Sequence, residues 1–363
     1  MPKKKTSLAS SSLFVSKVNK ELLTEVRQFI LNARQAVARA VDSGLVALYW
    51  TIGNRIKKEI LQEKRAEYGK QIISALGREL ENEFGRGFSE KTLRHMIRFV
   101  ESFPDLAIVS ALGRQLGWTH FRMIIYLDDP IKRDFYAEMC RLEGWNTRVL
   151  QKKIDSMLFE RTALSKKPAA LAALELKKLR DEDIVTPELV FRDPYILDFL
   201  GLKDTFAEKD LETAILREIE NFILELGVGF TFVARQKRMS IDHEEYHLDL
   251  LFYHRHLRRL VALELKLGEF KPAYKSQMEL YLAWLNRHER TKDEEKPIGL
   301  ILCAGKKEET IELLDLEKKG IHVSSYWTKA LPKEQLQQKL HEAIMRIRAE
   351  MTIRSISNET RCL

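Results

Sequence analysis

The chain has few cysteines and no long hydrophobic run. Its 363 residues include three cysteines, Cys140, Cys303 and Cys362, which lie far apart and never at Cys-x-x-Cys spacing. This scarcity excludes a disulfide framework and a zinc knuckle, and it favours a reducing compartment. No apolar run approaches the roughly 20 residues that cross a membrane, so we expect no membrane partner.

The N-terminal sequence also lacks the pattern of a secretory signal peptide. The basic residues 1–5 are followed by Ser- and Thr-rich sequence, whereas a signal peptide continues into an apolar segment. Hydrophobic residues make up 45% of the chain and charged residues 31%, which is typical of folded domains. We therefore expect a cytoplasmic protein, and its length suits two domains.

Charge is distributed unevenly along the chain. The formal net charge is +8, but residues 1–180 carry +13 and the remainder carries −5. Basic side chains release counterions when they contact phosphates, and this favours binding to polyanions. The asymmetry predicts a basic half that binds nucleic acid and an acidic half with another task.

The basic half has helical periodicity and no convincing strand. Residues 71–84 predict a helix, residues 85–88 a glycine turn, and Ser89 the N-cap of a second helix. That second helix has a basic face, as a DNA-binding helix-turn-helix would, although such a face can equally be only solvated. The candidate phosphate contacts on this helix are Lys91, Arg94 and Arg98.

Composition predicts five segments. Residues 161–187 are alanine-rich and end at Thr186-Pro187, which indicates a helical or loosely ordered connector. The expected divisions are a disordered basic N-terminus (1–18), a helical nucleic-acid-binding domain (19–160), a linker (161–187), a second domain (188–350) and a tail (351–363).

Two strands of the second domain alternate apolar and polar residues. Residues 246–254 and 259–266 have the two-residue period of a hairpin. One face is apolar, with Leu248, Leu250 and Phe252 facing Val261, Leu263 and Leu265. The opposite face carries Asp249, Glu264 and Lys266.

A turn centred on His256-Leu257 would set Asp249 opposite Glu264, with their carboxylates within about 6 Å. Like charges in this arrangement destabilise a sheet unless something offsets them. The expected partner is a divalent cation that prefers oxygen ligands, Mg²⁺ or alternatively Mn²⁺. Lys266 would stabilise negative charge on a phosphate. The alternative is a solvated strand face.

Further candidates flank the hairpin. Gln277 and Tyr281 lie four residues apart, hence on one face of a predicted helix. Glu212 falls within the apolar stripe of a predicted helix over 208–226, where an acid needs a partner; it is otherwise an acid favoured by the helix dipole. The preceding strand carries four candidate phosphate contacts, Arg235, Gln236, Lys237 and Arg238.

The spacing Asp-x(14)-Glu-x-Lys resembles that of the PD-(D/E)xK nucleases. The chain is similar to the bacterial YhcG-type PDDEXK nucleases over about residues 190–345, and its helical half also looks like theirs. The similarity lies in the runs Asp193–Leu200, Phe222–Gly227, Phe230–Gln236, Leu248–His254, Glu264–Lys266, Gln277–Met278 and Ile298–Cys303. Two departures are Leu248, where the pattern has proline, and Ser276, where it often has glycine.

This resemblance implies a fold and an activity. We expect an α/β protein, with an all-helical N-terminal domain followed by a restriction-endonuclease-like mixed sheet. The resemblance also implies that a first-helix glutamate joins the metal site and that a Gln-x-x-x-Tyr helix steadies it. The predicted elements are helices 196–203, 208–226, 274–288, 307–317 and 332–349, and strands 229–238, 246–254, 259–266, 297–303 and 320–326.

The expected function is a Mg²⁺-dependent phosphodiester hydrolase that acts on DNA, with endonuclease activity preferred. The alternative is a non-catalytic nucleic-acid-binding or regulatory protein that retains the nuclease fold; a helical protein-binding adaptor is a third. The sequence leaves open endo- or exonucleolytic cleavage, DNA or RNA, substrate specificity, oligomeric state and pathway.

Overall fold

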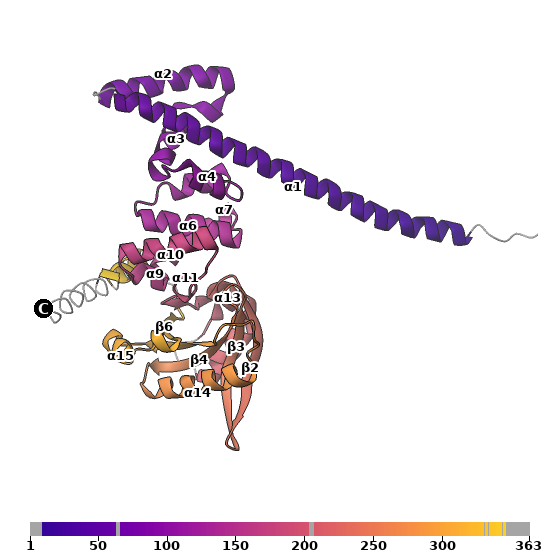
Figure 1. The fold of residues 1–363 in the computed structure, drawn as a ribbon, viewed down its shortest axis with the longest axis vertical. Helices are drawn as coiled ribbons and strands as arrows, with labels where there is room; N and C mark the ends of the chain where they lie inside the picture. The colour runs from indigo at the N-terminus through magenta and orange to yellow at the C-terminus, as the bar shows by residue number, and fades with distance from the viewer. Residues whose placement is uncertain are drawn as a thin grey trace, which may run out of the picture. The chain divides into compact units, whose positions relative to one another are not determined.

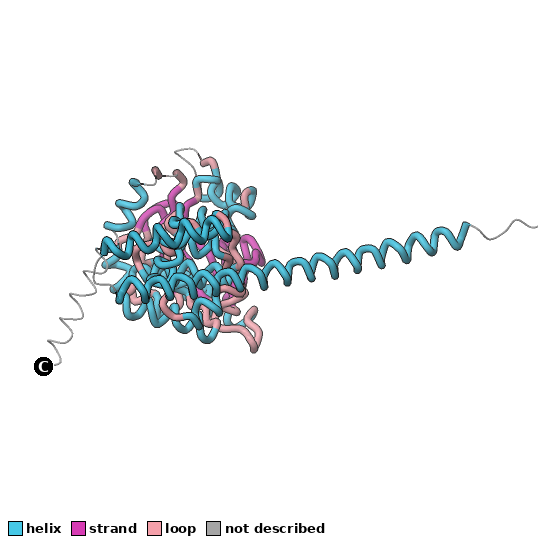
Figure 2. The backbone as a smooth tube through the Cα atoms, turned by 90° about the horizontal axis from the view of Figure 1, so that it is seen from above, coloured by secondary structure: helices cyan, strands magenta, loops and turns pink. Residues whose placement is uncertain are grey.

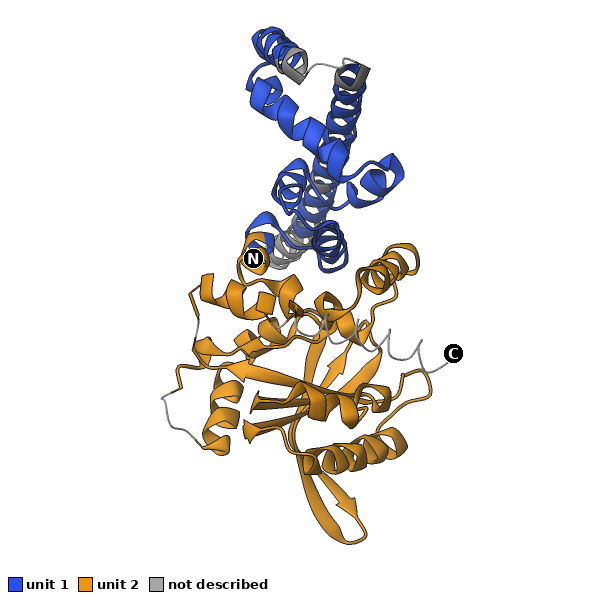
Figure 3. Ribbon diagram, turned by 90° about the vertical axis from the view of Figure 1, so that its left-hand side faces the viewer, with its two compact units in different colours: residues 1–150 blue, residues 151–363 orange. Residues whose placement is uncertain are grey.

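The computed structural model describes residues 9–62, 66–202, 207–329, 331–332, 334–342 and 344–345. The chain divides into two compact units, Met1–Leu150 and Gln151–Leu363 (Figure 3). None of the described helices has the length and apolar character that crossing a membrane requires.

The described residues of the first unit form helices joined by short loops and contain no strand (Figures 1 and 2). Its elements are α1 (Ala9–Gln62), α2 (Ala66–Phe84), the 3₁₀ helix η1 (Arg86–Phe88), α3 (Glu90–Ser102), α4 (Leu106–Leu112), α5 (Trp118–Ile124) and α6 (Pro130–Glu143). Helix α7 (Thr147–Asp155) crosses the division at residue 150. The predicted helix, turn and second helix are therefore α2, η1 and α3, with Ser89 at the N-cap of α3.

Helix α3 packs closely on α1. Leu93 and Met96 are buried on its apolar face, and Gly53 of α1 lies so near that a Cβ there would be 2.2 Å from the Met96 carbonyl oxygen. The N-terminus departs from the prediction for residues 1–18. Residues 9–18 belong to α1, because helical structure continues N-terminally from the packed part; residues 1–8 lie outside the described residues.

The second unit contains the sheet and the remaining helices. The helices are α8 (Leu158–Arg161), α9 (Ala163–Lys166), α10 (Ala169–Glu182), α11 (Pro187–Val190), η2 (Asp198–Leu200), α12 (Glu208–Arg217), α13 (Ile219–Leu226), α14 (Ala273–His288), α15 (Glu308–Leu313) and η3 (Glu317–Lys319). Residues 161–187, expected as a helical or loosely ordered connector, are mostly helical and belong to this unit. Leu164, Leu176 and Leu179 in this segment are buried.

The sheet is six-stranded and mixed, in the order β1-β6-β5-β4-β3-β2. Its strands are β1 (Tyr195–Ile196), β2 (Phe230–Ile241), β3 (Glu244–His254), β4 (Arg259–Glu269), β5 (Ile298–Gly305) and β6 (Ile321–Trp327). Strands β2, β3 and β4 are antiparallel neighbours, whereas β4, β5, β6 and β1 run parallel. The predicted architecture, a helical region followed by a mixed sheet, is confirmed.

Each face of the sheet has its own core. Helices α12 and α13 contribute Leu211, Ile215 and Phe222 to the core that contains Leu250 and Leu263. Helix α14 contributes Met278, Tyr281, Leu282 and Leu285 to the core on the other face, which includes Leu251 and Ala262. Gly299 of β5 permits the close approach of α14, since a Cβ there would lie 2.5 Å from the Met278 sulfur.

Several predicted details are wrong. The segment 196–203 is not a helix, because Tyr195 and Ile196 pair with β6 and only the short η2 follows. The helix predicted over 208–226 is two helices, interrupted at Glu218 with φ −106° and ψ 31°. Leu248 belongs to the core beneath α14, not to the core of Leu250, because the strand alternation is interrupted between them. The predicted helix 332–349 lies partly outside the described residues.

Candidate active site

The hairpin register brings Asp249 and Glu264 together. Strands β3 and β4 pair from Leu250↔Leu263 to His254↔Arg259, so the turn is centred between residues 256 and 257 as predicted. The Asp249 backbone N–H donates to Glu264 Oε1 at 3.3 Å. In return the Leu265 backbone N–H donates to Asp249 Oδ2 at 2.9 Å. The two acidic side chains therefore share one small region where β3 separates from β4.

The surroundings of Glu264 disfavour a charged carboxylate. Its side chain is 4% exposed, on the face that α14 covers. Burial, and secondly the Asp249 carboxylate, raise the pKa of Glu264 to about 7. A cation bound here would offset the repulsion and stabilise the charged form of Glu264.

Lys266 lies directly beside this pair. Its Nζ donates to Glu264 Oε2 at 2.9 Å and lies 5.4 Å from the centre of the Tyr274 ring. Burial disfavours the ammonium, but the carboxylates of Glu264, Glu208 and Asp249 together outweigh burial, so the pKa of Lys266 is raised. The lysine is therefore charged and directed at the acids.

Helix α14 adds the predicted glutamine and tyrosine. Gln277 Nε2 donates to the Tyr281 hydroxyl at 2.7 Å. That hydroxyl donates in turn to the His247 carbonyl at 3.3 Å, two residues before Asp249. Burial, and further the Glu264 and Asp249 carboxylates, raise the pKa of Tyr281, which fits its location near the acids. The structure thus brings five predicted residues into one neighbourhood: Asp249, Glu264, Lys266, Gln277 and Tyr281.

Glu212 is not among them. Among the described residues, no hydrogen bond or ion pair links Glu212 to Asp249, Glu264 or Lys266. Glu208, one turn earlier on α12, instead lies 3.6 Å from Lys266 Nζ. The apolar stripe singled out this helix, but it could not show which of its turns lies next to Lys266.

Gln236 on β2, a candidate phosphate contact in the sequence, instead contacts one of the two acids. Its side-chain amide donates to Asp249 Oδ1 at 3.2 Å. The sequence offered one signal, a polar residue within a strand that pairs with the strand of Asp249.

The candidate phosphate contacts differ in their surroundings. On α3, Lys91 and Arg94 are exposed, and Arg94 pairs with Glu90 at 2.7 Å. Arg98 donates to the Ile125 carbonyl, stacks over Tyr126 and lies 3.7 Å from Asp128. Arg98 therefore connects α3 to the end of α5.

On β2, Arg235 is exposed, whereas Lys237 pairs at 2.7 Å with Glu289, which follows α14, and lies near the Trp284 ring. The pair with Glu289 satisfies the charge of Lys237. Arg235 is the better placed of the two for a phosphate.

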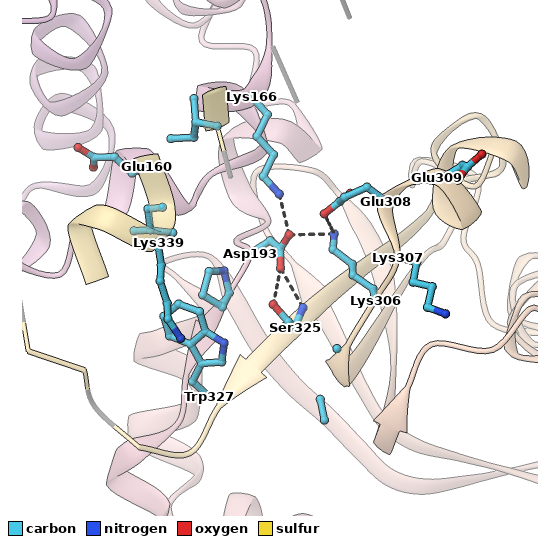
Figure 4. A pocket seen from close by; sticks show the side chains of 15 residues that line it. Glu160, Lys166, Asp193, Lys306, Lys307, Glu308, Glu309, Ser325, Trp327 and Lys339 are labelled. Carbon is cyan, nitrogen blue, oxygen red and sulfur yellow. Dashed lines mark hydrogen bonds and ion pairs between the residues drawn. The ribbon is translucent and has the colours of Figure 1, made fainter. Parts of the chain in front are cut away.

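Another charged cluster surrounds Asp193 at the ends of β5 and β6 (Figure 4). Asp193 pairs with Lys166 at 2.6 Å and Lys306 at 2.8 Å, and it accepts from the Ser325 N–H and hydroxyl. Burial opposes the charge of Asp193, but both lysines outweigh it and depress the pKa of the carboxyl. With four donors on one carboxylate, this cluster joins α9 to β6 and is not the acid pair of a metal site.

The residues beside Lys266 fit a hard cation. Mg²⁺ commonly takes one or two protein carboxylates and completes its coordination with water and substrate phosphate oxygens. Asp249 and Glu264 supply two carboxylates, one of them strained by burial and repulsion. In the described part of the chain, no group of three or more His, Cys, Asp or Glu side chains gathers as a metal cluster.

Comparison with known proteins gives matches over both units. Residues 188–341 match the family model of the YhcG PDDEXK nuclease domain, and residues 25–161 match that of the DUF1016 N-terminal domain. Over 305 residues the chain is 35% identical to "Putative nuclease YhcG" of Escherichia coli (strain K12), which covers 76% of this chain and 80% of that protein.

Solved structures match a smaller part. A repair endonuclease from Pyrococcus abyssi is 23% identical with a TM-score of 0.24, over 34% of this chain and 49% of that one. EndoMS in a complex titled EndoMS-dsDNA2 is 20% identical with a TM-score of 0.26, over 36% and 49%. The match spans about half the length of each of these chains.

Proposed function

The chain belongs to the YhcG PDDEXK nuclease family, and on that premise we propose that it is a divalent-metal-dependent endonuclease acting on DNA. The observation that carries the proposal is the pair of facing carboxylates, Asp249 and Glu264, with Lys266 bonded to one of them. That set of groups supports attack of water on phosphorus, with cleavage of a P–O bond and proton transfer to the leaving oxygen.

Each residue of the site has a proposed role. Asp249 and Glu264 would hold Mg²⁺ or Mn²⁺, together with the Leu265 carbonyl oxygen. The bound cation lowers the pKa of water and polarises a phosphoryl oxygen. Lys266 positions the attacking water or the scissile phosphate and stabilises the charge that develops on its oxygens.

Neighbouring residues would maintain this geometry. Tyr281 bonds to the backbone carbonyl of His247 and so fixes the part of β3 that carries Asp249. Gln277 in turn orients the hydroxyl of Tyr281. Glu208, and not Glu212, is the acid of α12 next to Lys266, so its role differs from the metal-binding one expected of Glu212. At 3.6 Å Glu208 helps to orient the ammonium.

The substrate class follows from charge. The net charge of +13 over residues 1–180 supports binding of a polyanion by the helical unit. Lys91 and Arg94 of α3 are exposed for phosphates there, and Arg235 of β2 is exposed in the unit that holds the acids. We assign DNA as the substrate and place α2–η1–α3 as its helix-turn-helix.

The proposal is tested with labelled linear, circular and branched DNA and matching RNA, incubated with Mg²⁺, Mn²⁺ or EDTA. The expected result is metal-dependent cleavage of circular DNA, which has no ends, with RNA left intact. Asp249→Asn should abolish both cleavage and the response to metal. If the wild type cuts nothing with either ion but binds DNA, the chain is a non-catalytic nucleic-acid-binding protein.

A further inference from the structure

Gln236 has an unusual backbone conformation. Seven described non-glycine residues have positive φ, and six of them lie in turns or at helix ends: Met157, Asp183, Asp242, His243, Arg258 and Asp315. Gln236, with φ 43°, lies inside strand β2. A left-handed conformation is strained for a residue with a side chain and persists where surrounding structure enforces it.

This conformation coincides with a reversal of the strand faces. Side chains two residues apart normally lie on the same face. Here Leu250 belongs to one core and Leu248 to the other. Their partners on β2 are Arg235 and Lys237, the residues on either side of Gln236. The reversal therefore occurs in both strands at the level of Gln236 and Asp249.

At this reversal, the Asp249 carboxylate lies between one hydrogen-bond donor on β2 and one on β4. Gln236 Nε2 donates to Oδ1 at 3.2 Å, and the Leu265 N–H donates to Oδ2 at 2.9 Å. The carboxylate is thus held from β2 and from β4, although β3 no longer pairs with β4 beyond Leu250. Each carboxylate oxygen has a second lone pair, so both bonds are compatible with a bound cation.

We propose that Gln236 is a positioning residue, which orients the Asp249 carboxylate for the cation. The inference rests on the proposed function. Groups that hydrogen-bond to metal ligands fix ligand orientation, and their loss typically lowers metal affinity or activity 10- to 100-fold. The strained backbone of Gln236 places its amide at Asp249, and this explains why the strain persists within a strand.

The identity of the residue supports a role for the side chain. Glycine adopts positive φ without strain, and asparagine adopts it more readily than most residues. If only the change of face mattered, glycine would serve better at this position. The chain instead has a glutamine whose amide reaches Asp249.

The variant Gln236→Gly separates the two roles, because it removes the amide and relieves the backbone. Gln236→Asn is the second variant; it retains an amide but is one methylene shorter, so it reaches Asp249 less well. Ser240→Gly is the matched control, an exposed position of the same strand with no contact to the acids.

Mn²⁺ binding to the full chain without DNA is measured by calorimetry, and the Mn²⁺ concentration for half-maximal DNA cleavage is measured separately. Gln236→Gly should weaken Mn²⁺ binding about 10-fold or more, with the unfolding temperature of the metal-free protein unchanged or raised. Gln236→Asn should also bind more weakly, and Ser240→Gly should match the wild type.

Wild-type Mn²⁺ affinity in Gln236→Gly, or in Gln236→Asn if the glycine variant does not fold, overturns the inference and leaves the proposed function intact. A wild type that neither binds Mn²⁺ nor cleaves overturns both. Weaker binding together with an equally large loss of stability would make Gln236 a purely structural residue, which also overturns the inference.

Discussion

Glu264 contributes unfavourably to the stability of the metal-free protein. The side chain is buried against Asp249, and its pKa rises to about 7 as a result. Between the ordinary pKa of a glutamate and 7, the unfolded chain has released this proton while the folded chain retains it. The folded state therefore binds more protons, and its stability falls as pH rises through this window.

We predict that Glu264→Gln stabilises the metal-free protein above pH 7, by up to about 3 kcal/mol for a shift of this size; loss of the bond to Lys266 reduces the gain. The difference should vanish below about pH 4.5, where both states are protonated. Denaturant unfolding in EDTA at pH 5 and pH 8 measures it. Glu269→Gln, at the exposed end of β4, is the control, and equal gains in the two variants would contradict the explanation.

Replacing Lys266 by alanine tests the chemical step. The variant removes the ammonium but retains both acids, and removal of one such electrostatic interaction typically lowers the rate 10²- to 10³-fold. Affinity for DNA should change little, because most phosphate contacts are assigned to the helical unit. Single-turnover cleavage and filter binding separate the two quantities. Lys271→Ala, an exposed lysine shortly after β4, should behave as wild type; a similar loss there would point to a general charge effect.

At the scale of elements, the site depends on what surrounds the end of β4. Helix α14 approaches one face across Gly299 and brings Tyr281 to the backbone of β3. The first turn of α12 brings Glu208 to Lys266. The interruption at Glu218 makes α12 a separate short helix, so its direction is not that of α13.

Glu208 and Glu212 form a matched pair of variants on one helix. Glu208→Gln should lower the cleavage rate severalfold, because Lys266 loses an ion pair; the carboxylate is 45% exposed, so water screens the interaction. Glu212→Gln should cleave at the wild-type rate. Single-turnover rates at saturating Mg²⁺ decide between them. A loss confined to Glu212→Gln would restore the assignment made from sequence.

At the scale of the whole molecule, the basic charge of residues 1–180 is assigned to DNA binding. Charge reversal of both Lys91 and Arg94 should weaken binding to all sequences alike. It should also reduce the slope of log affinity against log salt by about 0.9 for each phosphate that the protein no longer neutralises. Fluorescence anisotropy over a range of salt concentrations measures this slope.

Arg98→Ala is the comparison, because Arg98 donates to the Ile125 carbonyl and so stabilises the first unit. It should lower the unfolding temperature more than it changes the salt slope. If reversal of Lys91 and Arg94 leaves binding unchanged, the exposed face of α3 is only solvated.

Local sequence patterns determined much of this protein. Alternation of apolar and polar residues located β3 and β4, because one face of each had to join a core and a shift of one residue would have turned it away. The structure also buries the other face, beneath α14. The register of the two strands alone set Asp249 against Glu264. Helical periodicity and the glycine turn likewise located α2 and α3, since both signals act within a few residues.

Other features were decided only by the tertiary structure. Segment 196–203 has a helical pattern, but pairing with β6 prevails over local propensity. The choice of Glu208 over Glu212 depends on where α12 meets β4, which no spacing within α12 encodes. Gln236 reaches Asp249 because the side chains of β2 and β3 change to the other face of the sheet at these two residues. Regular alternation along either strand would not predict this change of face. In each case the deciding interaction joins residues that are distant in sequence or breaks a local rule, so its energy appears only once the chain has folded.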